Sequence, residues 1–346
     1  MLNCCRINRS LGKKLLFSRK TFIAGAAAVA AAGPALAVRA AGPIRLGYSA
    51  WPGWFPWKVA EAKGLFAKNG VDVQMVWFDD YTASISALSA GKIDGNSETT
   101  NDAISGVAGG APRTIVLTND NSFGNDQVIA KTAIPDVKGL AGKNVAVEFG
   151  LVDHFLLLLA LQKAGVPQSA VHIKPLPTDK AAAAFAGGKV DACAVFAPFT
   201  TAATKTNLGH VIASSKDFPG AIPDHLVLAP ALVKARPADV QKIVKTWFDT
   251  LAYIKANHAE SVAIMAKRAG VSIADYASYD DGTHIFSLKE NLEAFAPGTT
   301  IKHLSASGKM MADFLLKAKL TKTPVAIGNL FDGRFVKAYA AAHPVT

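Results

Sequence analysis

One short pattern occurs twice in the first two hundred residues of this chain. In the first copy, a run of small residues at 82–90 leads into Gly91-Lys92-Ile93-Asp94-Gly95, and in the second, residues 179–187 lead into Gly188-Lys189-Val190-Asp191-Ala192. Upstream of each copy stand a helix-like run, a glycine and an apolar run, in the same order. Such a repeat predicts two similar α/β lobes, which face each other across a cleft that can close on a small molecule.

Apolar runs at 44–48, 71–77 and 92–95 predict strands, and helix-like runs from Pro56 to about Lys68, at 81–90 and at 152–164 predict helices. Because strand-like and helix-like segments alternate, mainly parallel sheets are expected. The polar segment 119–127 separates the copies and is the predicted crossing between the lobes, and the Pro and Gly residues near 218–223 mark the return. We therefore expect lobe 1 to comprise residues 43–125 and 223–346, and lobe 2 to comprise residues 126–222. Helical periodicity at 237–257, 260–269, 307–317 and 331–341 predicts helices that complete lobe 1.

Residues 1–37 have the pattern of a signal peptide: six basic residues and no acid, an uncharged run, and then Ala35-Leu36-Ala37 as a cleavage site. The apolar run is shorter than the roughly 20 residues of a membrane span. Arg19-Lys20 resembles a twin-arginine motif with lysine in second place, so the twin-arginine and general secretion routes both stay open. The formal charge of +11 falls to +5 after cleavage, which no longer favours nucleic acid as a partner. We expect a soluble protein outside the cytoplasm.

Cysteine usage leaves little room for metal or thiol chemistry. Cys4 and Cys5 lie within the signal peptide, and Cys193 alone remains, so neither an intramolecular disulfide nor a zinc motif is expected. His154 and His225 do not belong to a recognisable arrangement of base and nucleophile. The sequence therefore predicts no cofactor, no metal site and no catalytic residue.

The loops that follow the predicted strands carry the candidate site, because ligands of α/β sheets bind at the carboxyl ends of the strands. These loops combine aromatic rings with carboxylates and contain little Arg or Lys. Their main members are Trp51, Trp54, Trp77, Glu98, Thr100, Asp102, Asp120, Asp126, Asp153, Phe196 and Asp224.

This inventory suits a planar or quaternary cation better than an anion. Aromatic rings attract a desolvated cation by about 1–2 kcal/mol, and carboxylates accept paired N–H bonds. Asp102 and Asp153 stand near predicted helix starts, where their charge would repel a sulfonate or nitrate. The alternative role for these two residues is simple helix capping.

The signal peptide, the repeated lobes, the tryptophan loop and the repeated "glycine, basic, apolar, aspartate" phrase together resemble a known family. They are similar to the periplasmic solute-binding proteins of ABC importers in the nitrate, sulfonate and taurine group, which shares its fold with thiamine-pyrimidine synthases. The resemblance implies an α/β, two-lobe clamshell of periplasmic-binding-protein type II. It also implies a small-molecule solute, a periplasmic location, and membrane permease and ATPase subunits as partners.

Several phrases resemble one branch of that family, found beside urea-carboxylase-like or guanidine-degrading enzymes. They are Trp51-Pro52-Gly53-Trp54, Trp77-Phe78-Asp79, Asn101-Asp102, Asn119-Asp120-Asn121-Ser122, Gly124-Asn125-Asp126, Val152-Asp153-His154-Phe155 and Phe196-Ala197-Pro198-Phe199. This resemblance implies guanidine or a related nitrogen compound as the solute.

The resulting expectation is a non-enzymatic binding protein that captures a guanidine-like cation between its lobes. The expected ligand-binding residues are Trp51, Trp54, Trp77, Glu98, Thr100, Asp102, Asp120, Asp153, Phe196 and Asp224. A sulfonate, taurine or nitrate binder of the same family is the alternative. An enzyme of the pyrimidine-synthase kind is a remote one, because it needs a cysteine-rich segment that this sequence lacks.

Overall fold

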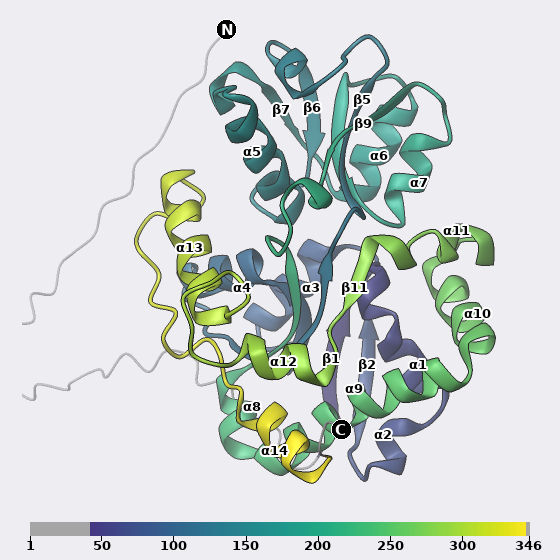
Figure 1. Cartoon of the computed structure of the whole chain (residues 1–346), viewed down its shortest axis with the longest axis vertical. Helices are drawn as coiled ribbons and strands as arrows, with labels where there is room; N and C mark the ends of the chain where they lie inside the picture. Colours follow the sequence, from purple (N-terminus) through teal and green to yellow (C-terminus); the bar gives the residue numbers. More distant parts are fainter. Residues whose placement is uncertain (1–41, 344–346) are drawn as a thin grey trace, which may run out of the picture. The chain divides into compact units, whose positions relative to one another are not determined.

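The computed structural model describes residues 42–343, so the predicted signal peptide lies outside the described residues. Eleven strands in this part of the chain form two sheets (Figure 1). The first sheet has six strands in the order β11-β4-β10-β3-β1-β2, and the second has five in the order β7-β6-β8-β5-β9. We call each sheet with the helices packed on it lobe 1 and lobe 2, respectively.

The strands of lobe 1 are β1 (Ile44–Tyr48), β2 (Val73–Trp77), β3 (Gly95–Thr99), β4 (Thr114–Ser122), β10 (Pro223–Leu228) and β11 (Thr283–Ile285). Those of lobe 2 are β5 (Asp126–Lys131), β6 (Asn144–Val147), β7 (His172–Pro175), β8 (Ala192–Phe196) and β9 (Gly209–Ser214). The chain thus crosses between the sheets from β4 to β5 and from β9 to β10. The residue boundaries of the lobes given above stay a prediction.

The helices of the first part of the chain are α1 (Pro56–Ala62), α2 (Leu65–Lys68), α3 (Tyr81–Ser89), α4 (Thr100–Ala108), α5 (Val152–Ala164), α6 (Thr178–Ala186) and α7 (Phe199–Thr204). After the return crossing follow α8 (Pro230–Ala235), α9 (Pro237–Ala256), α10 (His258–Ala269), α11 (Ile273–Ala277), α12 (Leu288–Ala294), α13 (Leu304–Lys317) and α14 (Arg334–Ala342). Among residues 42–343, no helix has both the length and the hydropathy that crossing a membrane requires.

The repeated phrase has the same structural task in both lobes. Gly91 and Gly188 adopt φ of 68° and 70°, which allows the chain to turn sharply after α3 and α6. The aspartate that follows then fixes the start of a parallel strand of its sheet, β1 in lobe 1 and β6 in lobe 2. Asp94 Oδ2 accepts the backbone N–H of Arg45 at 2.9 Å, and Asp191 Oδ2 accepts that of Asn144 at 3.0 Å.

The prediction of mainly parallel sheets is wrong. β1 runs parallel to β2 and β3, and β6 runs parallel to β7 and β8, as the repeat requires. The strands that carry the crossings are different: β10 is antiparallel to β3 and β4, and β5 is antiparallel to β8 and β9. A strand that enters a sheet from the other lobe pairs antiparallel with its neighbours.

Two predicted elements also have different bounds. The third strand, expected at 92–95, is Gly95–Thr99, so polar residues that looked like a loop are buried in a central strand. The first helix, expected to run from Pro56 to about Lys68, is divided at Gly64, which has a φ of 63°. The aromatic contact between Trp57 and Trp247, with ring centroids 4.6 Å apart, packs this helix region on α9.

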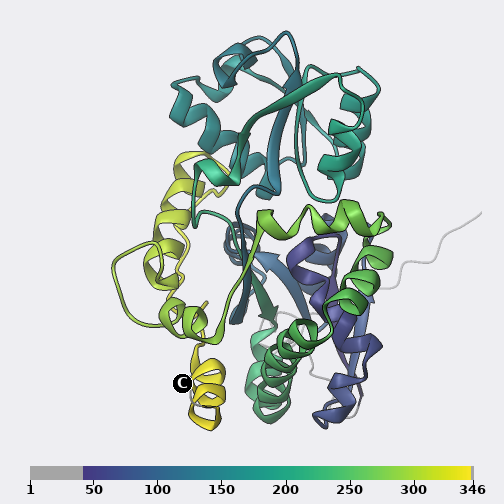
Figure 2. The same ribbon diagram turned by 45° about the vertical axis from the view of Figure 1, so that its right-hand side comes forward.

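The segment around α11 belongs to the return part of the chain and reaches lobe 2. Figure 2 shows it beside the helices of that lobe, close to α7. The hydroxyl groups of Tyr279 and Thr201 lie 2.6 Å apart, and Lys205 pairs with Asp275 at 2.9 Å. These contacts tie the two lobes together on one side of the site described next.

Candidate functional site

A small cavity lies where the facing edges of the two sheets meet. Its volume is about 10 Å³, which is room for about one water-sized molecule. The lining residues come from both lobes and stand at strand ends or helix starts: Trp51, Trp54, Tyr81, Thr99, Asp126, Val152, Phe196, Ile222 and Asp224. Because β5 and β10 are antiparallel to their neighbours, Asp126 and Asp224 reach this edge from the amino ends of their strands.

Aromatic rings form most of the cavity wall. Trp51 meets Phe196 edge to face with centroids 6.1 Å apart, and Trp54 meets Tyr81 at 5.3 Å. Trp51 and Trp54 are held by the 3₁₀ turn Pro52–Trp54, whose Pro52 starts the turn directly after β1. The cavity therefore has rings from lobe 1 on one side and Phe196 from lobe 2 on the other.

Asp120 and Asp224 form a carboxyl pair at the base of this wall. They are opposite each other in the register of β4 and β10, and the indole N–H of Trp51 donates to Asp120 Oδ1 at 2.9 Å. Two carboxylates opposite each other would repel, so the pair favours a state in which at least one of the groups is protonated. Burial and the neighbouring acid raise the pKa of Asp224 well above its usual value.

Asp126 begins β5 on the lobe 2 side of the crossing. It is 1% exposed, and its backbone N–H donates to Ser122 Oγ at 3.3 Å. Burial raises the pKa of Asp126 to about 7. This carboxyl group is therefore poised to change its protonation near neutral pH.

A second acidic pair, Glu148 and Asp153, lies in lobe 2. The hydroxyl of Thr178 is 3.0 Å from Glu148 Oε2 and 2.9 Å from Asp153 Oδ2. One hydroxyl has one proton to donate, so one of the two carboxyl groups must itself donate and be protonated. Burial raises the pKa of both groups. Thr82 of lobe 1 bonds to the other oxygen of Glu148, so this pair also connects the lobes.

Asp102 lies in the first turn of α4, beside the cavity residue Thr99. Its oxygens accept from Thr99 Oγ1 and Asn101 Nδ2, each at 2.7 Å, and burial raises its pKa well above the usual value. Within the described part of the chain, neither Asp102 nor Asp153 accepts a backbone N–H from its helix. The capping role considered above is thus not the one these side chains have.

The acidic groups have no basic partner. Among residues 42–343, no ion pair involves Asp102, Asp120, Asp126, Glu148, Asp153 or Asp224. Arg113, the buried arginine of this region, pairs instead with Glu98 at 3.2 Å. His225 is neutral, because burial lowers its pKa to about 3. Buried charges are normally paired, so these groups either hold protons or face a cation.

Several buried polar atoms of the cluster also lack hydrogen-bond partners. They are Oδ2 of Asp120, Asp126 and Asp224, Oδ1 of Asp153, and the indole nitrogen of Trp54. Buried polar groups are rarely left unpaired. The unpaired atoms here are mainly acceptors, which a ligand rich in N–H donors would satisfy. In the described residues, no three His, Cys, Asp or Glu side chains are grouped closely enough to hold a metal ion.

The structure brings together seven of the ten residues predicted to bind ligand. Trp51, Trp54, Phe196 and Asp224 line the cavity. The remaining three are neighbours of lining residues. Asp102 is hydrogen-bonded to Thr99, Asp120 is hydrogen-bonded to Trp51, and Asp153 follows Val152 in the chain.

The other three predicted residues lie elsewhere and have other partners. Trp77 stacks on Phe55 and carries the guanidinium of Arg268 over its ring at 3.7 Å. Glu98 is neutralised by Arg113, and the hydroxyl of Thr100 is 2.7 Å from His225 Nε2. None of the three lines the cavity.

Five cavity residues were absent from the predicted set: Tyr81, Thr99, Asp126, Val152 and Ile222. Asp126 had a usable signal, since it follows Asn125 in the polar crossing segment. Val152 and Ile222 had none, because an apolar residue beside a cavity looks the same in sequence as one in a core.

Comparisons with known proteins agree with this architecture. Residues 40–270 match the NMT1-like family. A provisionally named binding protein of Brucella abortus (strain 2308) is 26% identical over 322 residues, covering 91% of this chain and 99% of that protein. The taurine-binding periplasmic protein of Escherichia coli (strain K12) is 26% identical over 274 residues, covering 74% of this chain and 85% of that protein.

Among solved structures, the alkanesulfonate-binding protein SsuA from Xanthomonas axonopodis pv. citri, bound to MOPS, superposes with a TM-score of 0.72. It is 20% identical and covers 85% of this chain and 100% of that one, so the likeness concerns the fold. The predicted α/β, two-lobe fold of the periplasmic-binding-protein type is confirmed. The family match spans more than half of the sequence, and the chain therefore belongs to the NMT1-like family.

Proposed function

We propose that this protein is the solute-binding component of an ABC importer and that its solute is a small nitrogen-containing cation, with guanidinium favoured. The names of its relatives support the general role. In this proposal the signal peptide is removed near Ala37, and the periplasmic protein closes its lobes on the solute. It then delivers the solute to permease and ATPase subunits.

The observation that carries the choice of a cation is the uncompensated acidic cluster. Six buried carboxyl groups converge on or next to the cavity, and within residues 42–343 no basic side chain pairs with them. An isolated charge is costly to bury, and a cationic ligand supplies the missing partner. A sulfonate in the same place would face carboxyl oxygens instead of N–H donors.

Guanidinium also suits the shape of the site. It is planar and directs N–H groups outward in its plane, where carboxyl oxygens of Asp126 and Asp224 are unpaired. The rings of Trp51, Trp54 and Phe196 provide faces and edges for its flat surfaces. The free volume is about that of one water molecule, so even so compact a solute enters only when the walls of the cavity move apart.

The relatives favour a second candidate of the same class. This candidate is a binding protein for a sulfonate, because one similar protein is named as taurine-binding and another as alkanesulfonate-binding. An enzymatic role has less support, because Cys193 is fully buried and burial raises the pKa of its thiol, which suppresses the reactive thiolate.

Isothermal titration calorimetry of the purified protein against guanidinium, urea, ammonium, taurine and nitrate tests the proposal. We expect saturable binding of guanidinium, with weaker binding of urea because it carries no charge to pair with the carboxylates. Tight binding of taurine or nitrate without binding of guanidinium would show that the solute is an anion. The proposed role in an importer would then still hold.

A further inference from the structure

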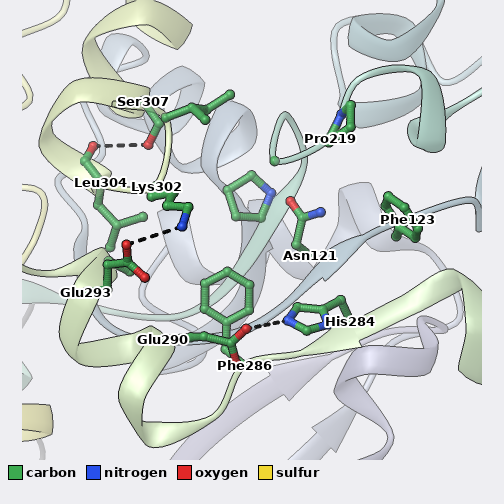
Figure 3. A pocket seen from close by; sticks show the side chains of 14 residues that line it. Asn121, Phe123, Pro219, His284, Phe286, Glu290, Glu293, Lys302, Leu304 and Ser307 are labelled. Atoms are coloured by element: carbon green, nitrogen blue, oxygen red, sulfur yellow. Dashed lines mark hydrogen bonds and ion pairs between the residues drawn. The ribbon is translucent and has the colours of Figure 1, made fainter. Parts of the chain in front are cut away.

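A second and larger cavity lies beside the two crossings between the sheets (Figure 3). Its volume is about 350 Å³, within the range of small-molecule sites. It shares no lining residue with the acidic cavity. The lining comes from the end of β4 and the loop after it, from the loop before β10, and from the region of β11, α12 and α13: Asn121, Phe123, Pro219, Gly220, Pro223, His284, Phe286, Glu290, Glu293, Ala294, Ile301, Lys302, Leu304 and Ser307.

The walls of this cavity are mainly apolar. Phe123 and Ile301 are large apolar side chains, and they are 41% and 43% exposed. Because both line the same cavity, they form an exposed apolar patch instead of isolated surface residues. Phe286 and Leu304 face the same space in Figure 3. A further apolar cavity of about 180 Å³ shares Gly220, Pro223, Ile301 and Ser307 with it, so the apolar surface continues along α13.

One buried polar group interrupts the apolar wall. Asn121 is 6% exposed and is fixed in β4 between Pro223 of β10 and His284 of β11. Its Nδ2 donates to the carbonyl of Ser122 at 2.7 Å, which leaves Oδ1 as an acceptor without a partner. Figure 3 shows the amide directed into the space between Phe286, Lys302 and Pro219.

The charged groups at the rim are engaged with one another. His284 Nε2 lies 2.7 Å from Glu290, and Lys302 pairs with Glu293 at 3.5 Å. Among the described lining residues, no cation is therefore left without a partner, and two carboxylates stand near the cavity. Lys216, outside the lining, lies over the ring of Phe123 with its Nζ 5.7 Å from the centroid. An anionic ligand is disfavoured, whereas a neutral one is compatible with the rim.

We propose that this cavity is a second ligand site, which binds a small neutral aromatic molecule through an N–H donor. The ring packs among Phe123, Phe286 and Ile301, and a small rotation of the Asn121 amide, whose Oδ1 is buried in the free protein, lets this oxygen accept the ring N–H. Indole has this chemistry, because it combines a flat apolar body with one donor and no acceptor that needs a partner. It serves as the probe, and 1-methylindole, which lacks the N–H, is the matched control.

Calorimetric titration of the purified protein with both compounds tests the site. We expect indole to bind saturably and 1-methylindole to bind about fivefold to tenfold more weakly, which is the loss of one hydrogen bond. N121L removes the acceptor at similar side-chain volume and should make the two compounds bind equally. I301D places a charge at an exposed position of the wall and should weaken indole by about tenfold or more.

The test separates this site from the acidic cavity. D126N alters the proposed solute site and should leave indole binding unchanged, whereas I301D should leave guanidinium binding unchanged. Equal binding of indole and 1-methylindole to the unmodified protein would overturn the proposal, as would indole affinity that neither N121L nor I301D alters. Absence of indole binding would overturn it as well, whatever the result for guanidinium.

Discussion

The protonation states of the buried carboxyl groups determine which ligand the acidic site can bind. Thr178 lies within hydrogen-bond distance of both Glu148 and Asp153, and Asp120 stands opposite Asp224 across β4 and β10, so each of these two carboxyl pairs favours at least one proton. Asp126 has no acidic hydrogen-bond partner of this kind, and one of its oxygens is unpaired at the cavity. Of the six acids, Asp126 is therefore the one best placed to ionise and pair with a bound cation.

The substitution Asp126→Asn tests this assignment. It preserves the shape of the side chain and removes the charge, so we expect guanidinium to bind about 2 kcal/mol or more weakly, or roughly 30-fold, as for truncation of a buried charge pair. Calorimetry measures the change. The matched control is Asp313→Asn on α13, an exposed acid paired with Lys309, which should bind guanidinium normally. Equal affinity of both variants would remove Asp126 from the site.

The acidic and aromatic residue types around the cavity were easier to predict from the sequence than the individual residues that line it. Trp51 and Asp120 were both in the predicted set, but the hydrogen bond between them joins residues 69 positions apart. Trp77 and Glu98 are of the same residue types and were likewise expected to follow strands. In the structure, however, Arg268 lies over the ring of Trp77, and Arg113 forms an ion pair with Glu98. Which acid receives an arginine depends on packing between distant segments, and spacing along the chain does not contain that information.

At the scale of elements, the 3₁₀ turn after β1 sets the position of the Asp120 carboxyl group. Gly53 packs so closely on it that a Cβ at this position would lie 2.0 Å from Asp120 Oδ2. The neighbouring Trp51 donates its N–H to the same carboxyl group. The turn and β4 therefore have to fit each other for the cavity wall to form.

Gly53→Ala should disturb this fit. Because the added methyl group meets the Asp120 carboxyl, we expect the acid to shift, the hydrogen bond from Trp51 to be lost and guanidinium affinity to fall about tenfold or more. The control is Gly328→Ala, since a Cβ there meets no atom within 4 Å. Calorimetry and thermal melts of both variants are the measurements. Normal affinity in Gly53→Ala would show that this contact does not position the site.

The elements themselves were predicted well where local signals are strong. β1 and α5 have the bounds expected from apolar pattern and flanking Pro and Gly residues. β3 was misplaced, because Asn96 to Thr99 are polar and buried only through contacts with other parts of the fold. The antiparallel strands β5 and β10 were missed for a related reason: the direction of a strand depends on where the chain enters the sheet.

For the whole molecule, the acidic cluster links solute binding to pH. A monovalent solute can neutralise only one of the buried acids, so most of them must stay protonated when it is bound. An acid that gives up its proton to pair with the cation makes binding stronger as pH rises. An anionic solute would have the opposite dependence, because protonated carboxyl groups are the ones that tolerate it.

The stability of the free protein should fall between about pH 6.5 and pH 8. Asp126 has a raised pKa of about 7, against roughly 3.9 in an unfolded chain, so the folded state binds more protons in this range and loses stability as they leave. The other acids of the cluster are shifted in the same direction. His154 and His225, whose pKa values are lowered, act in the opposite sense up to about pH 7.5, because an unfolded histidine titrates around pH 6.5. The raised acids outweigh them, since burial also raises the pKa of Asp120 to about 7.

Thermal melts with and without guanidinium measure both effects. We expect the melting temperature of the free protein to decrease from pH 6.5 to 8, and the increase caused by guanidinium to grow over the same range, because the cation replaces the departing proton. Asp126→Asn should reduce both trends, while Asp120, whose pKa burial also raises to about 7, keeps part of the pH dependence of stability. Calorimetry in two buffers of different ionisation enthalpy should also detect proton release on binding. A free protein whose stability is constant or rises over this range, with no proton released, would show that the acids do not exchange protons for the solute.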